Sequence, residues 1–346
     1  MSPSFEEALR LYDYTLPPEL IAQTPASPRD SAGLVVYDRA TKQTTWTNFS
    51  AIGTFLPNNA VLVLNETKVI PAKMELTRST GGRVSALAVG TTDVGVRVMA
   101  NRKLKTGETL TLAEGMTFAV TGDEGRYWML QPSFPVTELQ RVLELAGSMP
   151  LPPYIKQTPL SRDEQRREYQ SVFARNSGSI AAPTASLHFT DELLKSLNAQ
   201  GIRTAFVTLH VHLGTFAPLT PEQWESGHLH VEYFSMTDET ADLLNAAKKK
   251  GDPIVAVGTT SVRTLESASD EHGVLTQRNG TTDLFIREGY RFNFVDAMIT
   301  NFHVPQSSLL MLVAAFTGRD AMLNLYKQAI EKQFRFFSFG DAMLIR

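Results

Sequence analysis

The sequence predicts an α/β protein, with a mostly parallel-sheet core into which a small antiparallel β-barrel is inserted. Strand-like and helix-like segments alternate in the second half of the chain, which is typical of a parallel sheet. Six strand-like segments follow one another between 73 and 131, about ten residues apart, without helical periodicity between them. The 346 residues are 42% hydrophobic and 20% charged, a globular composition. At roughly 150 residues per domain, that length indicates about two domains.

The first elements of the core are two short strands. Apolar runs at 34–37 and 61–64 are each bounded by polar or turn residues, which favours buried strands. The barrel then begins at Lys73. Its expected strands are residues 73–78, 84–89, 94–100, 108–112, 116–120 and 126–131. We therefore expect an inserted barrel domain at 73–134 and a discontinuous core domain at 1–72 and 135–346.

Helical periodicity returns after the barrel. We expect helices at 137–146 and 161–170, with the proline-rich segment 150–154 as a fixed extended loop between them. Thr237 is suited to cap a helix whose last turn holds three lysines before Gly251. A buried strand at 253–257 and a helix that starts at Thr259 follow.

Composition excludes several classes of chemistry. The chain has no cysteine, so disulfides, thiolate nucleophiles and cysteine-held zinc or iron–sulfur sites are excluded. The start of the chain lacks a secretory pattern, and the longest strongly apolar run, 309–316, is far shorter than the roughly 20 residues that span a bilayer. We expect a cytoplasmic protein without a membrane partner. The formal charge is −3, yet residues 73–105 hold seven basic and two acidic residues, either a solvated surface or a surface for RNA.

Histidines gather where apolar runs end. Five of the seven lie between His188 and His230, and His303 follows another apolar run. Ligand sites in α/β sheets lie beyond the carboxyl ends of strands, so these side chains are candidate site residues. His210 and His212 share one face if their segment is a strand, as do His228, His230 and Glu232. The latter three leave open a metal-dependent hydrolase as the alternative from another class.

A second candidate site is the segment VGTTSVR at 257–263. A strand, a glycine and a hydroxyl-rich helix start, Thr259-Thr260-Ser261, suit a carboxylate or phosphate, although a simple helix cap has the same pattern. The segment lacks the Gly-Lys-Ser/Thr ending of a Walker loop, and the chain has neither Gly-x-Gly-x-x-Gly nor Gly-x-Ser-x-Gly.

Several segments together resemble the S-adenosylmethionine:tRNA ribosyltransferase-isomerase family of queuosine biosynthesis. They run from end to end in family order. They are YTLPPELIAQTP at 14–25, LVLNETKVIPAK at 62–73, PLPPYI at 150–155, AAPTASLHFT at 181–190, the segments 207–216 and 257–267, DLFI at 283–286 with GYRF at 289–292, TNFHVP at 300–305, and RFFSFGDAMLI at 335–345.

The resemblance implies an α/β core with an inserted barrel and a specific transfer. The ribosyl moiety of S-adenosylmethionine moves onto 7-aminomethyl-7-deazaguanine at the wobble position of a tRNA with a GUN anticodon. Epoxyqueuosine forms, and adenine and methionine leave. S-adenosylmethionine is then a co-substrate, and no cofactor or metal is expected. The sequence does not fix the oligomeric state, and we expect a monomer.

The residue types suit that chemistry, because a sulfonium acidifies the neighbouring sugar C5′ proton and one base can start the rearrangement. We expect His210, then His230 and Glu232, as catalytic residues. Glu232 is also suited to stabilise the sulfonium, and Phe189, Phe216 or Tyr233 to add cation–π attraction. Lys68, Lys73 and Arg263 are candidates for RNA phosphates. The candidate substrate-binding residues are Asn65, Lys68, Pro183, Thr184, His188, Thr259, Thr260, Ser261, Arg263, Asn301 and His303.

Four positions depart from the family pattern. Ala32 interrupts an expected Ser-Arg-Leu, and Ser186 and His212 stand where glycines are usual. Gly227 stands where a histidine is usual, and the histidine follows one position later, at His228. These changes leave open a relative with another acceptor or an altered sugar donor. A non-enzymatic RNA-binding module is the remaining alternative, and the histidine-rich strand ends disfavour it.

Overall fold

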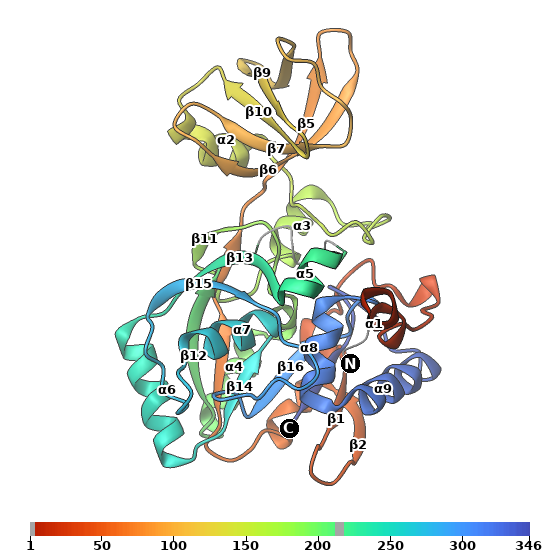
Figure 1. Ribbon diagram of the computed structural model, residues 1–346, viewed down its shortest axis with the longest axis vertical. Coiled ribbons are helices and arrows are strands. Elements are labelled where there is room, and N and C mark those ends of the chain that lie inside the picture. The colour runs from red at the N-terminus through yellow and green to blue at the C-terminus, as the bar shows by residue number, and fades with distance from the viewer. Residues whose placement is uncertain (1–3, 212–217) are drawn as a thin grey trace.

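A nine-stranded mixed sheet forms the core of the computed structural model, which describes residues 4–211 and 218–346 (Figure 1). In spatial order its strands are β15 (Asn279–Leu284), β13 (His228–Ser235), β12 (Arg203–Leu209), β3 (Val61–Asn65), β14 (Ile254–Val257), β16 (Ala297–Asn301), β17 (Ala342–Ile345), β1 (Gly33–Tyr37) and β2 (Thr44–Asn48). The central pairs β12–β3, β3–β14 and β14–β16 are parallel, as is β17–β1. The remaining pairs, most of them towards the edges, are antiparallel.

Strands of the core bury both faces because apolar residues occupy both sets of alternating positions. In β3, Val61 and Val63 pack into one apolar cluster, and Leu62 and Leu64 pack into the cluster on the opposite face. Such continuous apolar runs are typical of strands covered on both sides. The described helices are α1 (Phe5–Leu11), α2 (Leu139–Ala146), α3 (Arg162–Glu168), α4 (Asp191–Ala199), α5 (Pro221–Ser226), α6 (Asp238–Lys250), α7 (Thr259–Ala268), α8 (Ser308–Thr317) and α9 (Arg319–Glu331). Short 3₁₀ helices lie at Pro18–Leu20, Arg29–Ser31, Phe49–Thr54, Val136–Glu138 and Thr184–His188.

The barrel is closed and antiparallel, and it stands apart from the core at one end of the molecule (Figure 1). Around the barrel the strands are β10 (Tyr127–Pro132), β7 (Val96–Ala100), β6 (Arg83–Thr91), β5 (Lys73–Arg78), β8 (Thr109–Ala113) and β9 (Met116–Glu124). Each of the six segments expected from the sequence is one of these strands. Together with the mixed core sheet, the barrel confirms the predicted fold class.

A small parallel pair, β4 (Thr67–Val69) with β11 (Asn176–Ser179), lies in the segments that leave and re-enter the core around the barrel. The extended proline loop predicted at 150–154 is present, without helix or strand. Thr237 caps α6, and Gly251 ends it in the left-handed conformation at φ 77°, as predicted. Within residues 4–211 and 218–346, no single helix is long and apolar enough to cross a membrane; α8 and α9 meet that length and composition only as a pair bent by 110°.

Candidate active site

Two neighbouring cavities lie beyond the carboxyl ends of β14 and β16. Cavity A, with its opening to solvent, has a volume of about 600 Å³ and is lined by the end of β16 and the residues after it, by the start of the 3₁₀ helix at 184–188 and by the start of α7. Cavity B, with its opening to solvent, has a volume of about 590 Å³ and lies between α7, α8, β13 and the end of β15. Thr259, Thr260 and Leu309 line both cavities, so the first turn of α7 forms the boundary between them.

Gly258 makes the turn from β14 into α7. Its φ of 86° is in the left-handed region, which favours glycine, and the helix begins at Thr259 as predicted. Asn65 holds this turn in place. Its Nδ2 donates to the Leu209 carbonyl at 3.0 Å and to Thr260 Oγ1 at 3.3 Å, and its Oδ1 accepts from the Leu209 N–H at 3.1 Å. Asn65 therefore ties β3, β12 and α7 together beneath the cavities.

Asn301 lies at the wall of cavity A and is 1% exposed. Its Nδ2 donates to the Phe337 carbonyl at 3.0 Å and to His188 Nε2 at 3.3 Å. Since both N–H groups face acceptors, the orientation of the amide is fixed. Its Oδ1 has no hydrogen-bond partner within the residues that the structure describes.

Two histidines near this wall are neutral. Burial lowers the pKa of His188 to about 4, and the ring stacks on Phe49 with centroids 4.9 Å apart. His188 lies within the 3₁₀ helix at 184–188 rather than at the end of a strand. Burial lowers the pKa of His303 to about 3, and its Nε2 lies 2.8 Å from Thr300 Oγ1. His303 lines cavity A, whereas His188 lies behind it and supports Asn301.

The C-terminal motif 335–345 builds the opposite side of cavity A. Phe337 has a φ of 71°, an unusual backbone conformation for a bulky residue. Gly340 closes the turn, because a Cβ there would lie 2.5 Å from the Arg335 carbonyl oxygen. This loop presents Phe337 and Ser338 to the cavity, and Ser338 Oγ lies 2.7 Å from the Tyr154 hydroxyl of the proline loop.

A buried ion pair lies in cavity B. Glu232 and Arg263 are 3% and 6% exposed, and Arg263 Nη1 donates to the Glu232 carboxylate. The rest of the guanidinium is also held, by the Leu284 carbonyl at 3.1 Å and the Thr282 carbonyl at 3.3 Å. Arg263 thus faces protein groups, and it fixes the position of the carboxylate. His230 lines the same cavity on the more exposed side.

His210 follows β12, as predicted, and lies beside the cavities. Its Nδ1 is 2.8 Å from Thr67 Oγ1, and its backbone N–H donates to the Tyr233 carbonyl. Gly178 of β11 packs against the ring, since a Cβ there would lie 3.0 Å from the imidazole. The next residue, Val211, lines cavity A. His212 and Phe216, both singled out in the sequence, lie outside the described residues.

The metal-ligand set proposed for the alternative hydrolase is wrong. A register shift in β13 separates His228 from Glu232, and His228 Nδ1 instead lies 2.9 Å from Asp283. Glu232 is paired with Arg263. Within residues 4–211 and 218–346, no group of three His, Asp or Glu side chains is placed to hold a metal ion.

A comparison with known protein families identifies the family of this chain. The model of the queuosine biosynthesis protein family matches residues 9–345. The chain belongs to this family. It is therefore an S-adenosylmethionine:tRNA ribosyltransferase-isomerase by class, as the sequence motifs indicate. A crystal structure of the S-adenosylmethionine tRNA ribosyltransferase from Thermotoga maritima is similar to it, with 33% identity and a TM-score of 0.56 over 97% of this chain and 100% of that chain.

The fold of this queuosine biosynthesis protein brings together most of the expected site residues. Pro183, Thr184, Thr259, Thr260, Asn301 and His303 line cavity A, and His230, Glu232, Thr259, Thr260 and Arg263 line cavity B. Asn65, His188 and Ser261 are buried supports around them. Lys68 is exposed on β4, and Lys73 pairs with Glu75 at 3.3 Å.

Two aromatic candidates lie away from both cavities. Phe189 is fully buried against Phe49, and Tyr233 is 64% exposed. Among the departures from the family pattern, Gly227 ends α5 in the left-handed conformation, which favours glycine. Ala32 and Ser186 are buried, and nothing in the structure explains why these residue types stand there.

Sequence reasoning missed Tyr154, Thr300, Phe337 and Ser338, all of which line cavity A. Each lies in a segment that carries the family resemblance, but none of these residues has a spacing that distinguishes a site residue from a core residue. Only the three-dimensional convergence of the proline loop, β16 and the C-terminal loop reveals them.

Proposed function

We propose that this queuosine biosynthesis protein transfers the ribosyl moiety of S-adenosylmethionine to 7-aminomethyl-7-deazaguanine at the wobble position of a tRNA. Epoxyqueuosine forms, and adenine and methionine leave. The observation that carries the proposal is the pair of neighbouring cavities, one lined by residues without charge and one lined by the buried Glu232–Arg263 pair. A donor with an uncharged end and a cationic sulfonium fits these two cavities. Among tRNAs we expect those with a GUN anticodon as substrates, with the protein acting as a cytoplasmic monomer.

Glu232 is our candidate for the group that stabilises the sulfonium. Arg263 holds the carboxylate from one side and lines the same cavity, so the wall of cavity B carries a fixed charge pair in which the position of the carboxylate is set. In a buried site a fixed charge of this kind acts more strongly than it does in water, and it needs no reorganisation during the reaction.

Proton transfer from C5′ of the sugar requires a base within hydrogen-bond reach. His230 lines cavity B with Glu232, which supports it as that base. His210, the first candidate from the sequence, is bonded to Thr67 and borders cavity A through Val211, which supports a role nearer to the acceptor. Both assignments are hypotheses, and separate substitutions of His230 and His210 distinguish them.

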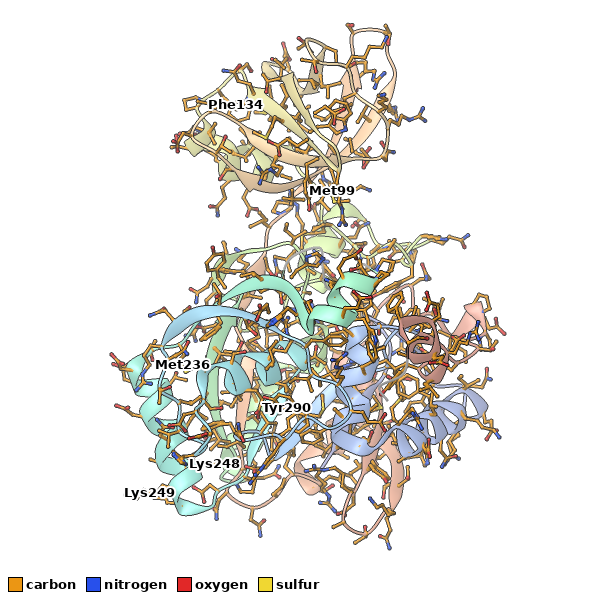
Figure 2. The ribbon with its side chains drawn as sticks, viewed as in Figure 1. Met99, Phe134, Met236, Lys248, Lys249 and Tyr290 are labelled. Atoms are coloured by element: carbon orange, nitrogen blue, oxygen red, sulfur yellow. The ribbon has the colours of Figure 1, made fainter. Side chains whose placement is uncertain are left out.

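A hollow between barrel and core is suited to a larger partner. This open cavity C has a volume of about 1130 Å³ with its opening to solvent included, and it is lined by strands β6 and β7 of the barrel, by Lys73 and Arg126, and by the proline loop. Met99, at the edge of the barrel that faces the core, also lines it (Figure 2). We propose that the anticodon arm lies here, because wobble bases in a single-stranded loop can be turned out into a pocket.

The test is incubation of the protein with S-adenosylmethionine and tRNA that carries the deazaguanine amine. We expect release of adenine and methionine that depends on this RNA. His230→Gln and Glu232→Gln should each lower single-turnover release by more than about tenfold. His228→Gln is the matched control on the same strand and should retain release. Release that requires a different RNA would instead favour a relative with another acceptor.

A further inference from the structure

Cavity A has one feature that the assignment of the reaction does not explain. Asn301 Oδ1 is buried at its wall and has no hydrogen-bond partner within the described part of the chain. Buried acceptors are nearly always paired, and an unpaired one is destabilising. The amide cannot turn over to relieve this, because its Nδ2 donates to the Phe337 carbonyl and to His188. Oδ1 is therefore an unused acceptor at the wall of cavity A.

The other walls of cavity A describe that ligand. Tyr154, Phe302 and Phe337 provide aromatic surface, and planar bases stack on such side chains. No described residue that lines the cavity carries a charge, since the pKa of His303 is lowered to about 3 and the remaining lining side chains are apolar, hydroxyl or amide groups. A neutral, flat ring with an N–H donor at its edge fits these walls.

We propose that cavity A holds the adenine ring of the ribosyl donor, with Asn301 Oδ1 as the acceptor for its exocyclic amino group. This inference rests on the proposed function. It adds where the adenine ring of the donor binds and which residue recognises it. In S-adenosylmethionine the ribose separates the adenine from the sulfonium. With the base in cavity A and the sulfonium beside Glu232 in cavity B, the sugar lies at Thr259 and Thr260, where the two cavities meet.

The acceptor base also carries an amino group, so it is the competing occupant. Its aminomethyl substituent is cationic at neutral pH, and cavity A offers no described carboxylate to that charge. Burial of an unpaired ammonium is costly. The deazaguanine therefore fits cavity A less well than adenine, and the experiment separates the two.

The test compares the binding of adenosine and of purine riboside, which lacks only the exocyclic amino group, by calorimetry with and without the tRNA. We expect adenosine to bind about tenfold more tightly. Asn301→Ala should reduce this ratio to near one, and Ser338→Ala, a change in the same cavity, should leave it unchanged. If Asn301→Ala does not fold, the comparison of adenosine with purine riboside on the unchanged protein still tests the inference.

Equal binding of the two nucleosides, or binding of neither, overturns the inference. Tight binding of free 7-aminomethyl-7-deazaguanine that depends on Asn301 and displaces adenosine also overturns it, because the cavity then belongs to the acceptor. RNA-dependent methionine release is scored separately. Release without discrimination between the nucleosides refutes only the inference, whereas discrimination without release refutes only the proposed reaction.

Discussion

His188 makes the stability of the protein depend on acidity. Its pKa is lowered by burial from 6.5 to about 4, so between these values the unfolded chain binds a proton that the folded chain does not. Stability therefore falls as the pH drops through this window, by about 1.4 kcal/mol per pH unit and by about 3 kcal/mol in total. His188→Gln retains an acceptor for Asn301 and should reduce the pH dependence measured by denaturant unfolding, while the slope due to His303, whose pKa burial lowers to about 3, remains. His272→Gln, at an exposed histidine, should not. Equal pH slopes for the unchanged protein and for His188→Gln contradict this prediction.

Gly178 controls the position of His210. A Cβ at residue 178 would lie 3.0 Å from the imidazole, and the φ of 150° disfavours an L side chain. Gly178→Ala should displace the ring from Thr67 and lower single-turnover release by about tenfold, because a ring displaced by a small distance no longer positions the acceptor correctly. The measurement is made also in a His210→Ala background, where Gly178→Ala should have little further effect. Gly90→Ala, which faces open space, is the control. If the effects of Gly178→Ala and His210→Ala on single-turnover release are fully additive, Gly178 does not act through His210.

The two members of the Glu232–Arg263 pair should depend on each other for their effect on stability. Arg263→Met removes the cation that faces a buried carboxylate, and this typically costs about 3–5 kcal/mol of the free energy of unfolding. Adding Glu232→Leu removes the buried charge as well, so the double variant should recover a large part of that loss. Denaturant unfolding of the two single variants and the double variant measures this. A double variant as unstable as Arg263→Met would show that packing, not charge, determines the cost.

At the scale of elements, α7 organises both the site and the loop behind it. Its Glu266 carboxylate accepts hydrogen bonds from the backbone N–H groups of residues 293, 294 and 295 at 2.9 to 3.1 Å, and from the Tyr290 hydroxyl at 3.2 Å. The family motif GYRF at 289–292 therefore belongs to a loop that hydrogen bonds to Glu266 hold against α7.

Glu266→Gln should loosen that loop. The amide replaces one accepting oxygen with a donor that faces backbone N–H groups, and we expect a loss of about 3 kcal/mol in the free energy of unfolding. Hydrogen exchange should show faster exchange at residues 293–295 than in the unchanged protein. Glu271→Gln, at an exposed carboxylate, is the control. Unchanged protection of these amides would contradict the assigned role.

The sequence predicts elements well where local chemistry determines them. The barrel strands follow from glycine-separated alternation, and α6 follows from its threonine cap, its lysines and its glycine end. The face of β13 is a different case. The period of two places His228, His230 and Glu232 together, but the register shift against β15 depends on the partner strand, which the sequence of β13 does not contain. The same holds for Asn301, since its unpaired oxygen becomes evident only with Phe337 and His188 in place.

At the scale of the whole molecule, the barrel extends beyond its strands. Leu139 and Leu143 of α2 belong to the apolar cluster of the barrel interior, and α2 lies beside the barrel (Figure 1). The boundaries at 73 and 134 stay a prediction, and we propose that the barrel unit runs to Gly147, where α2 ends. A fragment of residues 73–147 should then show cooperative unfolding, and one of residues 73–134, which lacks both leucines, should be less stable.

The basic surface of the barrel is where we expect the tRNA backbone. Of its seven basic residues at 73–105, Lys73, Arg78 and Arg97 are paired with carboxylates. Arg102 and Lys103 lie exposed in the loop between β7 and β8. If both contact phosphates, Arg102→Gln/Lys103→Gln should weaken tRNA binding and lower the slope of log Kd against log salt by between about 1 and 2. Lys249→Gln/Lys250→Gln removes the same charge at the end of α6, and Lys249 lies at the far end of the molecule from the barrel (Figure 2). Equal loss of slope in the two double variants would mean that net charge, and not the barrel surface, attracts the RNA.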